Sequence, residues 1–202
     1  MARGYTMRSR AEAVEKRREQ IYLAAASLFA EQHYDDVTLQ GIAERAGVSL
    51  KTVVRQFGSK EAVLLAGARY RTRHEDAERA VEPGDVGGAV RVLATRYEAI
   101  ADLVMKRIAL EERVPAIREA ANIARAHHTE WLATVFARWL PRRKGAKRTL
   151  RLMALFGATE IYVWWSWRLL GLSPRQAEAT MREMVEALLA RWSEPDHGRG
   201  DE

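Results

Sequence analysis

Side chains that can donate hydrogen bonds cluster behind a glycine in the stretch TLQGIAERAGVSLKTVVRQFGSKEAV, residues 38–63. The donors that follow Gly47 are Ser49, Lys51, Thr52, Arg55 and Gln56. Residues 48–60 contain neither Asp nor Glu, so no negative charge lies among these donors. Hydroxyl, amide and cationic groups in an acid-free segment suit contacts with phosphates and base edges. The chemistry indicated is binding to a polyanion.

Two short helices around Gly47 would have to position these donors. Thr38 can cap a helix that runs to about Arg45, and Ser49 can cap a second one to about Gln56. Gly47 permits the positive φ of a tight turn between them. Their small shared core would consist of Ile42, Ala46, Val48 and Val53, with Ala43 at the close crossing.

This pattern predicts a helix-turn-helix whose second helix presents Leu50, Lys51 and Thr52 outward from its first turn. The N-terminal end of such a helix enters the major groove of DNA. The alternative is a helical hairpin that binds nothing. The two caps, the donors and the following FGSKEAV favour DNA binding.

The run IYLAAASLFAEQHYDDVTLQGIAERAGVSLKTVVRQFGSKEAVLLA, Ile21–Ala66, resembles the DNA-binding module of the TetR family of bacterial transcriptional regulators. The resemblance implies that Thr38 and Lys60 contact phosphates. It also implies that Lys51 and Thr52 lie in the recognition helix, with Arg55 and Gln56 near its end. The full predicted DNA-contacting set is Thr38, Gln40, Ser49, Leu50, Lys51, Thr52, Arg55, Gln56 and Lys60.

Val54 departs from the family pattern, which usually has Tyr at this position. A valine cannot donate a hydrogen bond, so the backbone contact of that Tyr is absent here or is taken over by Arg55 or Gln56. At the start of the chain, Arg3, Arg8 and Arg10 could follow the minor groove or could form a disordered basic tail.

The overall charge of the chain also favours a polyanionic partner. The chain of 202 residues has a formal net charge of +6 and a pI of about 9.8. Nucleic acid is the first expected partner and an anionic membrane the second, while a solvated cationic surface is the alternative.

Several classes of protein are excluded or disfavoured. The absence of Cys excludes disulfides, thiolate zinc sites and cysteine nucleophiles. No apolar stretch of a signal peptide follows the basic start. The most apolar window, Leu152–Gly171, contains Glu160 and Arg168, which indicates a buried helix rather than a membrane span. We therefore expect a cytoplasmic protein.

Helical spacing throughout predicts an all-α fold of about nine helices. Three parts are expected: a helix-turn-helix module with its basic extension over 1–66, a helical effector-binding and dimerisation domain over 67–194, and a loose tail over 195–202. We expect the first helix to begin at the Ser9–Glu12 capping box. After residue 85 we expect one helix over about 86–101 and a shorter one that ends at about 111. A long helix is expected from Pro115 to about Leu140, another over about 149–170, and a last one from the Ser173–Gln176 box onward.

The expected body is rich in aromatic residues, because all six Trp lie after residue 130. Each Trp could belong to the core or to a subunit interface, but such a body also suits an apolar or aromatic ligand. Resemblance to the family implies a pocket in the middle helices and a homodimer interface in the last two long helices. The predicted ligand-binding residues are Met105, Trp131, Phe136, Glu160 and Trp164.

His127, His128 and Glu130 could suggest a metal site. Only His127 and Glu130 share a helix face, at i and i+3, and no third ligand is identifiable. A solvated polar face is the preferred interpretation, and no metal or other cofactor is expected. The sequence thus predicts a homodimeric, ligand-responsive repressor that binds a near-palindromic operator. An all-α enzyme and a membrane-surface protein are the alternatives; we find no catalytic triad, phosphate-binding Gly loop or metal triad that would support the enzyme.

Overall fold

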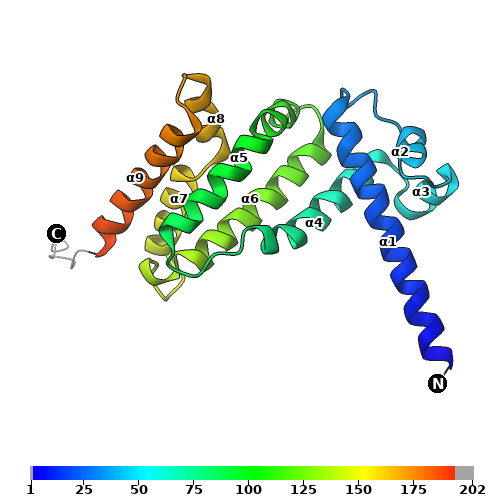
Figure 1. Ribbon diagram of the computed structural model, residues 1–202, viewed down its shortest axis with the longest axis horizontal. Coiled ribbons are helices and arrows are strands. Elements are labelled where there is room, and N and C mark those ends of the chain that lie inside the picture. Colours follow the sequence, from blue (N-terminus) through cyan, green and yellow to red (C-terminus); the bar gives the residue numbers. More distant parts are fainter. Residues whose placement is uncertain (1, 194–202) are drawn as a thin grey trace. The chain divides into compact units, whose positions relative to one another are not determined.

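The computed structural model describes residues 2–193, with side chains described from Glu12 onward. These residues form helices and no strand, which confirms the all-α fold (Figure 1). The helices are α1 (Ala2–Glu31), α2 (Leu39–Arg45), α3 (Leu50–Phe57), α4 (Lys60–Glu78), α5 (Val86–Ile108), α6 (Pro115–Val135), the short 3-10 helix η1 (Ala137–Trp139), α7 (Ala146–Ala158), α8 (Ile161–Leu169) and α9 (Pro174–Ser193).

Two helices are longer than predicted. Helix α1 begins at Ala2 rather than at Ser9, and α5 continues to Ile108 instead of ending near residue 101. Residues 5–31 and 89–114 contain neither Pro nor Gly, so nothing in these runs interrupts the helix. The predictions for Arg3, Arg8 and Arg10, and for a loose tail over 195–202, concern side chains and residues outside the described part of the chain.

One helix predicted over residues 149–170 is in fact two, separated at Thr159 and Glu160. Glu160 is extended, with φ −74° and ψ 136°, so the helix cannot continue through it. The Thr159 hydroxyl donates to the Leu155 carbonyl at 2.7 Å. The buried hydroxyl of Tyr97 donates to the Thr159 carbonyl at 2.8 Å, and this bond replaces the helical one that the break removes.

The chain divides into two units, and each has its own core. The first consists of residues 1–75 with 107–124, and the second of residues 76–106 with the chain from 125 onward. In the first unit, α2 packs against α1 and α3 around a cluster that includes Ile21, Leu28, Ile42 and Val53 (Figure 1). Val114, Ala116 and Ile117 form a smaller cluster under Tyr34, Leu64 and Leu65.

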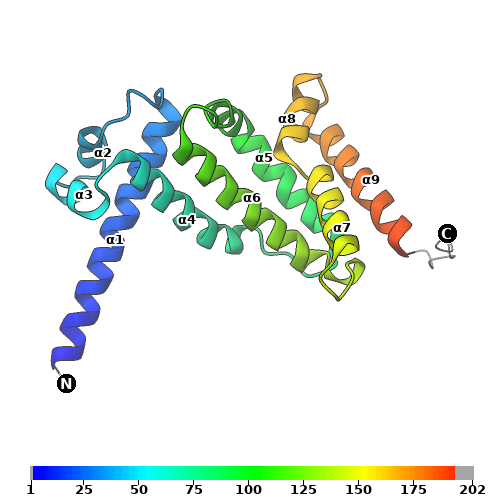
Figure 2. The same cartoon turned by 180° about the vertical axis from the view of Figure 1, so that it is seen from behind.

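The second unit has two adjoining cores that run along its helices. One contains Leu132, Phe136, Leu155 and Val185, and the other contains Leu93, Tyr97, Trp164 and Met181. Helices α7 and α8 both pack against α9, which closes this unit on one side (Figure 2). Within the described range, no helix combines the length and the apolar character that crossing a bilayer requires.

The bond from Tyr97 to the Thr159 carbonyl generates a prediction about stability. Tyr97→Phe leaves that buried carbonyl without its partner, so we expect the free energy of unfolding to fall by about 1–3 kcal/mol in urea titrations followed by circular dichroism. Tyr162→Phe is the matched control, because Tyr162 is exposed on α8. Equal stability of the two variants would contradict this role of Tyr97.

Candidate nucleic-acid interface

The turn between α2 and α3 is built around Gly47, whose φ is 65°. The Val48 amide donates to the Ala43 carbonyl at 3.0 Å, and the Gly47 amide donates to the Glu44 carbonyl at 3.1 Å. This pair of bonds is the Schellman motif, which satisfies the last carbonyls of a helix and needs a left-handed residue after its end. The predicted role of Gly47 as the turn residue is confirmed.

Each of the two helices is capped as the sequence predicts. The Thr38 hydroxyl accepts from the Gly41 amide at 3.0 Å at the start of α2. The Ser49 hydroxyl accepts from the Thr52 amide at 3.2 Å at the start of α3. Since Ser49 is also the second residue after Gly47, the end of α2 and the beginning of α3 are fixed within three residues.

Helix α3 buries one side and leaves the other open to solvent. Val53 is fully buried in the core that α3 shares with α1 and α2. Leu50 and Val54 remain 40% and 46% exposed, and the side chains of Lys51 and Arg55 are exposed as well. The open side of α3 therefore combines apolar and cationic groups at the N-terminal end of a helix, where the helix dipole also favours negative charge.

The segment that contains α2, the Gly47 turn and α3 matches a known protein family. Residues 21–66 match the family model described as "Bacterial regulatory proteins, tetR family". The match covers this N-terminal segment of the chain, and it supports the predicted resemblance to the TetR family. The matched segment contains α2, the Gly47 turn and α3, and it supports a DNA-binding regulator.

Solved structures of bacterial regulators share the fold over most of the chain. A regulator from Streptomyces coelicolor has a TM-score of 0.66 at 19% identity, with 92% of each chain covered. The fatty acid degradation regulator FadR from Bacillus halodurans has a TM-score of 0.60 at 19% identity, covering 85% of this chain and 97% of its own. A TetR regulator from Rhodococcus sp. RHA1 has a TM-score of 0.53 at 22% identity, covering 89% and 98%. No functionally curated protein matches the chain at significant similarity.

Two other predicted DNA-contacting side chains, Gln40 and Lys60, already have partners inside the protein, and a third, Gln56, is half-buried. Gln40 is exposed, and its amide donates to Glu44 at 2.6 Å. The Lys60 ammonium donates to the carbonyls of Tyr34 at 2.8 Å and Val37 at 3.1 Å, and it lies 4.4 Å from the centroid of the Tyr34 ring. Gln56 is half-buried, and its Oε1 is buried without a hydrogen-bond partner. Their contacts with DNA remain predictions.

An exposed ion pair holds the start of this unit together. The Arg45 guanidinium at the end of α2 donates to both carboxylate oxygens of Glu31 on α1, at 3.0 and 2.9 Å. The hydrogen bond from Arg45, followed by one from Ser27, lowers the pKa of Glu31 to about 2. Glu31 therefore stays ionised even at mildly acidic pH, and its ion pair with Arg45 joins α2 to α1.

The predicted ligand-binding residues all belong to the second unit, but they occupy different places. Phe136 and Trp164 are buried in its two cores, and Trp131 packs against both cores. Glu160 lies at the break between α7 and α8, and Met105 is half-buried near the end of α5. Ligand binding by this set remains a prediction.

A buried polar network that the sequence analysis missed adjoins Trp131. Arg79 donates to His128 Nδ1 at 2.7 Å, and its guanidinium carbon lies 4.4 Å from the centroid of the Trp131 ring. His128 Nε2 lies 3.0 Å from the Thr159 hydroxyl. Because Nδ1 accepts from Arg79, the proton of the neutral ring is assigned to Nε2, which then donates to Thr159.

The predicted solvated polar face at His127 and His128 is wrong for His128. Its side chain is buried, and burial, followed by the positive charge of Arg79, lowers the pKa of His128 to about 3. His127 is half-buried and contacts Asp76 at 2.7 Å. Among the described residues, no group of three potential ligands is arranged to hold a metal ion. The helical spacing of His128 and Leu132, which places both on the inner side of α6, was the available sequence signal.

The Gly47 turn generates the second prediction. Gly47→Ala is expected to lower the free energy of unfolding by about 1–2 kcal/mol, because a β-carbon disfavours the left-handed conformation. Space is not the cause, since a β-carbon at Gly47 would meet no atom within 4 Å.

Gly41→Ala is the matched control for this change. Gly41 lies inside α2, and a β-carbon there would be in ordinary contact with Thr38 Oγ1 at 3.4 Å. We expect the control to keep or raise the thermal midpoint, because alanine favours helix over glycine. If both variants lost stability equally, the proposed strain at Gly47 would be wrong.

Proposed function

We propose that this chain is a homodimeric repressor of the TetR type that binds a near-palindromic operator and is released from it by a small, largely apolar or aromatic effector. In this proposal residues 1–66 bind DNA, and residues 67–194 bind the effector and form the dimer. The protein acts as a binding protein rather than an enzyme. Since its partner is chromosomal DNA, it acts in the cytoplasm.

The geometry of α3 supports the DNA-binding part most directly. Val53 is buried while Leu50, Lys51 and Arg55 remain accessible, so one helix has an anchored side and a side free for the major groove. Thr38 and Ser49 are exposed at the starts of α2 and α3, where helix N-termini favour phosphate. The half-buried amide of Gln56 makes Arg55 the better substitute for the contact that Val54 cannot provide.

The exposed apolar side chains of the second unit support a homodimer. Leu150 and Met153 on α7, Tyr162 and Leu169 on α8, and Met184 on α9 are all exposed. Large apolar side chains that are exposed on one unit suit burial against a second subunit. Gly157 lies four residues after Met153, and a β-carbon there would meet nothing within 4 Å, so a second backbone could approach closely. Two-fold symmetry would then match the two halves of the operator.

Trp164 supports an effector site in the second unit. Its side chain is 1% exposed, and its indole N–H has no hydrogen-bond partner within the described part of the chain. Buried donors normally find a partner, so an unpaired one indicates a place where a ligand can supply an acceptor. Tyr97, His128 and Thr159 lie in the same region, beside the break between α7 and α8. An apolar compound with one acceptor group would suit these surroundings.

Effector release would follow if the ligand favours a conformation in which the two recognition helices no longer fit adjacent grooves. Arg79 directly follows α4, and its contacts with His128 and Trp131 reach the region of the proposed effector site. A ligand that displaced Trp131 or His128 would thus act on the residue next to the helix that leads from the DNA-binding module. This coupling is part of the proposal.

The test of DNA binding begins with selection of duplexes from a random pool by the wild-type protein. Lys51→Gln should weaken binding to the selected duplex by roughly tenfold or more and should lower the dependence of log K on log salt by up to about one unit. The measurement is fluorescence anisotropy across a salt series.

Lys106→Gln is the control, because Lys106 is an exposed lysine on α5 whose loss changes the net charge equally. The proposal requires Lys106→Gln to keep nearly full affinity. If no duplex is enriched, or if the two variants lose affinity equally, sequence-specific binding through α3 is wrong.

The dimer generates a separate prediction. Met153→Glu places a charge on the exposed apolar side of α7, so we expect it to shift the protein from dimer to monomer in sedimentation velocity experiments. Leu23→Glu is the matched control, because Leu23 is 59% exposed on α1 and Met153 is 48% exposed on α7. A dimer that persists in Met153→Glu, or a wild-type protein that sediments as a monomer, would contradict the proposed interface.

A further inference from the structure

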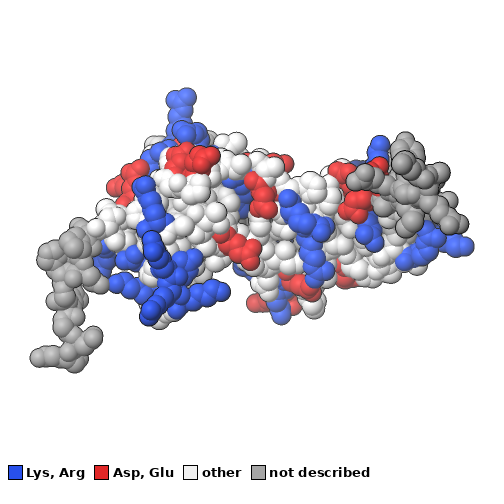
Figure 3. All heavy atoms as spheres, turned by 90° about the horizontal axis from the view of Figure 1, so that it is seen from below, with Lys and Arg blue, Asp and Glu red and all other residues white. Residues whose placement is uncertain are grey.

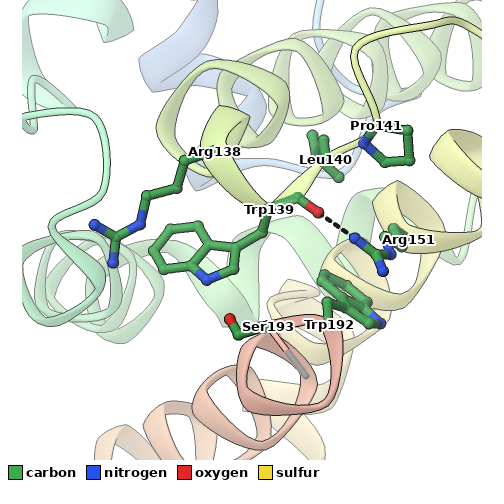
Figure 4. A pocket seen from close by; sticks show the side chains of 7 residues that line it. All are labelled: Arg138, Trp139, Leu140, Pro141, Arg151, Trp192 and Ser193. Atoms are coloured by element: carbon green, nitrogen blue, oxygen red, sulfur yellow. Dashed lines mark hydrogen bonds between the residues drawn. The ribbon is translucent and has the colours of Figure 1, made fainter. Parts of the chain in front are cut away.

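A pocket of about 420 Å³ opens beside the C-terminal end of α9 (Figure 4). Its walls come from residues 138–141, from Arg151 on α7, and from Trp192 and Ser193 at the end of α9. The volume lies in the range of about 300–1,000 Å³ that is typical of small-molecule sites. The lining combines two indoles, two guanidinium groups and the apolar Leu140 and Pro141.

Each arginine of the pocket stacks on an indole. The guanidinium carbon of Arg138 lies 3.8 Å from the centroid of the Trp139 ring, and that of Arg151 lies 5.0 Å from the centroid of the Trp192 ring. In the view of Figure 4 the Trp139 indole lies between the two guanidinium groups. A guanidinium that stacks by its face keeps its N–H donors at the edge, where they can bind a carboxylate in the plane of the group.

The positive charge of this pocket is not neutralised within the described part of the chain. Arg151 Nη1 donates to the Trp139 carbonyl at 2.6 Å, which fixes its position but not its charge. Neither Arg138 nor Arg151 pairs with a described carboxylate, and no acidic residue lines the pocket. Exposed Arg142, Arg143 and Lys144 follow in the segment between η1 and α7, and Figure 3 shows Lys and Arg side chains gathered over that region.

We propose that this pocket binds a planar aromatic carboxylate. The carboxylate would accept hydrogen bonds from Arg138 and Arg151, and the ring would pack on the indole and proline surfaces that the guanidinium groups leave uncovered. Both features are needed: the arginines supply the charge, and the aromatic lining supplies apolar area that a simple inorganic anion could not use. The pocket shares no residue with α3 or with the region of Trp164, so this inference does not rest on the proposed operator or effector.

The test uses naphthoate as the probe and the full-length protein. We expect saturable binding by isothermal titration calorimetry, together with shifts of the indole N–H signals of Trp139 and Trp192 in nitrogen-15 NMR spectra. Naphthalenemethanol, which has the same ring system and no charge, should bind roughly tenfold or more weakly. Equal affinity for the two compounds would overturn the proposal.

Substitutions locate the binding site. Arg138→Gln and Arg151→Gln should each reduce naphthoate affinity by roughly tenfold or more. Arg143→Gln removes the same charge from an exposed residue outside the pocket lining and should leave the affinity nearly unchanged. Thermal melts identify any variant that fails to fold. Arg138→Gln is the decisive variant, because Arg138 makes no hydrogen bond to lose within the part of the chain that the structure describes.

Two results would contradict this site even with folded protein. One is unchanged naphthoate affinity in both arginine variants, which would place the binding elsewhere in the chain. The other is the absence of binding both in the wild-type chain and in a full-length variant with Glu194→Gln, Asp196→Asn, Asp201→Asn and Glu202→Gln. This variant excludes competition by those four carboxylates and adds no new charge beside the pocket.

Discussion

The left-handed conformation of Gly47 is the constraint on which the DNA-binding region depends. It lets the Val48 amide return to the Ala43 carbonyl, which ends α2 and satisfies its last carbonyls. Ser49 then caps α3 at once, so the second helix starts in a fixed direction. That direction determines which side of α3 is buried: Val53 enters the core, and Lys51 with Arg55 remains in solvent. The position of the cationic side chains is thus a consequence of one backbone angle and two caps.

The second unit depends on a different kind of constraint, because its helices are positioned by long-range polar contacts. Tyr97 on α5 and His128 on α6 both contact Thr159, where the helical hydrogen bonding between α7 and α8 is interrupted. Arg79 joins the same network through His128 and covers the face of Trp131. A buried network of this kind has to be satisfied as a whole, so a change at one member alters the surroundings of the others. This coupling makes the interior of the unit a suitable place for a ligand to act.

The parts of the structure that follow from local chemistry were predictable from the sequence. The caps at Thr38, Ser49 and Ser173 require only a hydroxyl and an amide a few residues away, and each forms as expected. The turn at Gly47 is local in the same sense. The break at Thr159 was not predictable, because its replacement bond comes from Tyr97, which lies 62 residues away in the chain. The burial of His128 likewise depends on Arg79 and Thr159, which only the tertiary structure brings together. The pocket at Arg138 and Arg151 also requires contacts between α7, α9 and the segment after α6.

The first unit is assembled from two separate stretches of the chain, residues 1–75 and 107–124. Its smaller cluster places Val114, Ala116 and Ile117 on Tyr34, Leu64 and Leu65. During synthesis on the ribosome, the helix-turn-helix can therefore form early, but the apolar surface of α4 stays uncovered until residue 117 has left the exit tunnel. A chimaera that transplants only the first seventy-five residues onto another protein would leave these leucines open to water, and it would gain from including the later stretch as well.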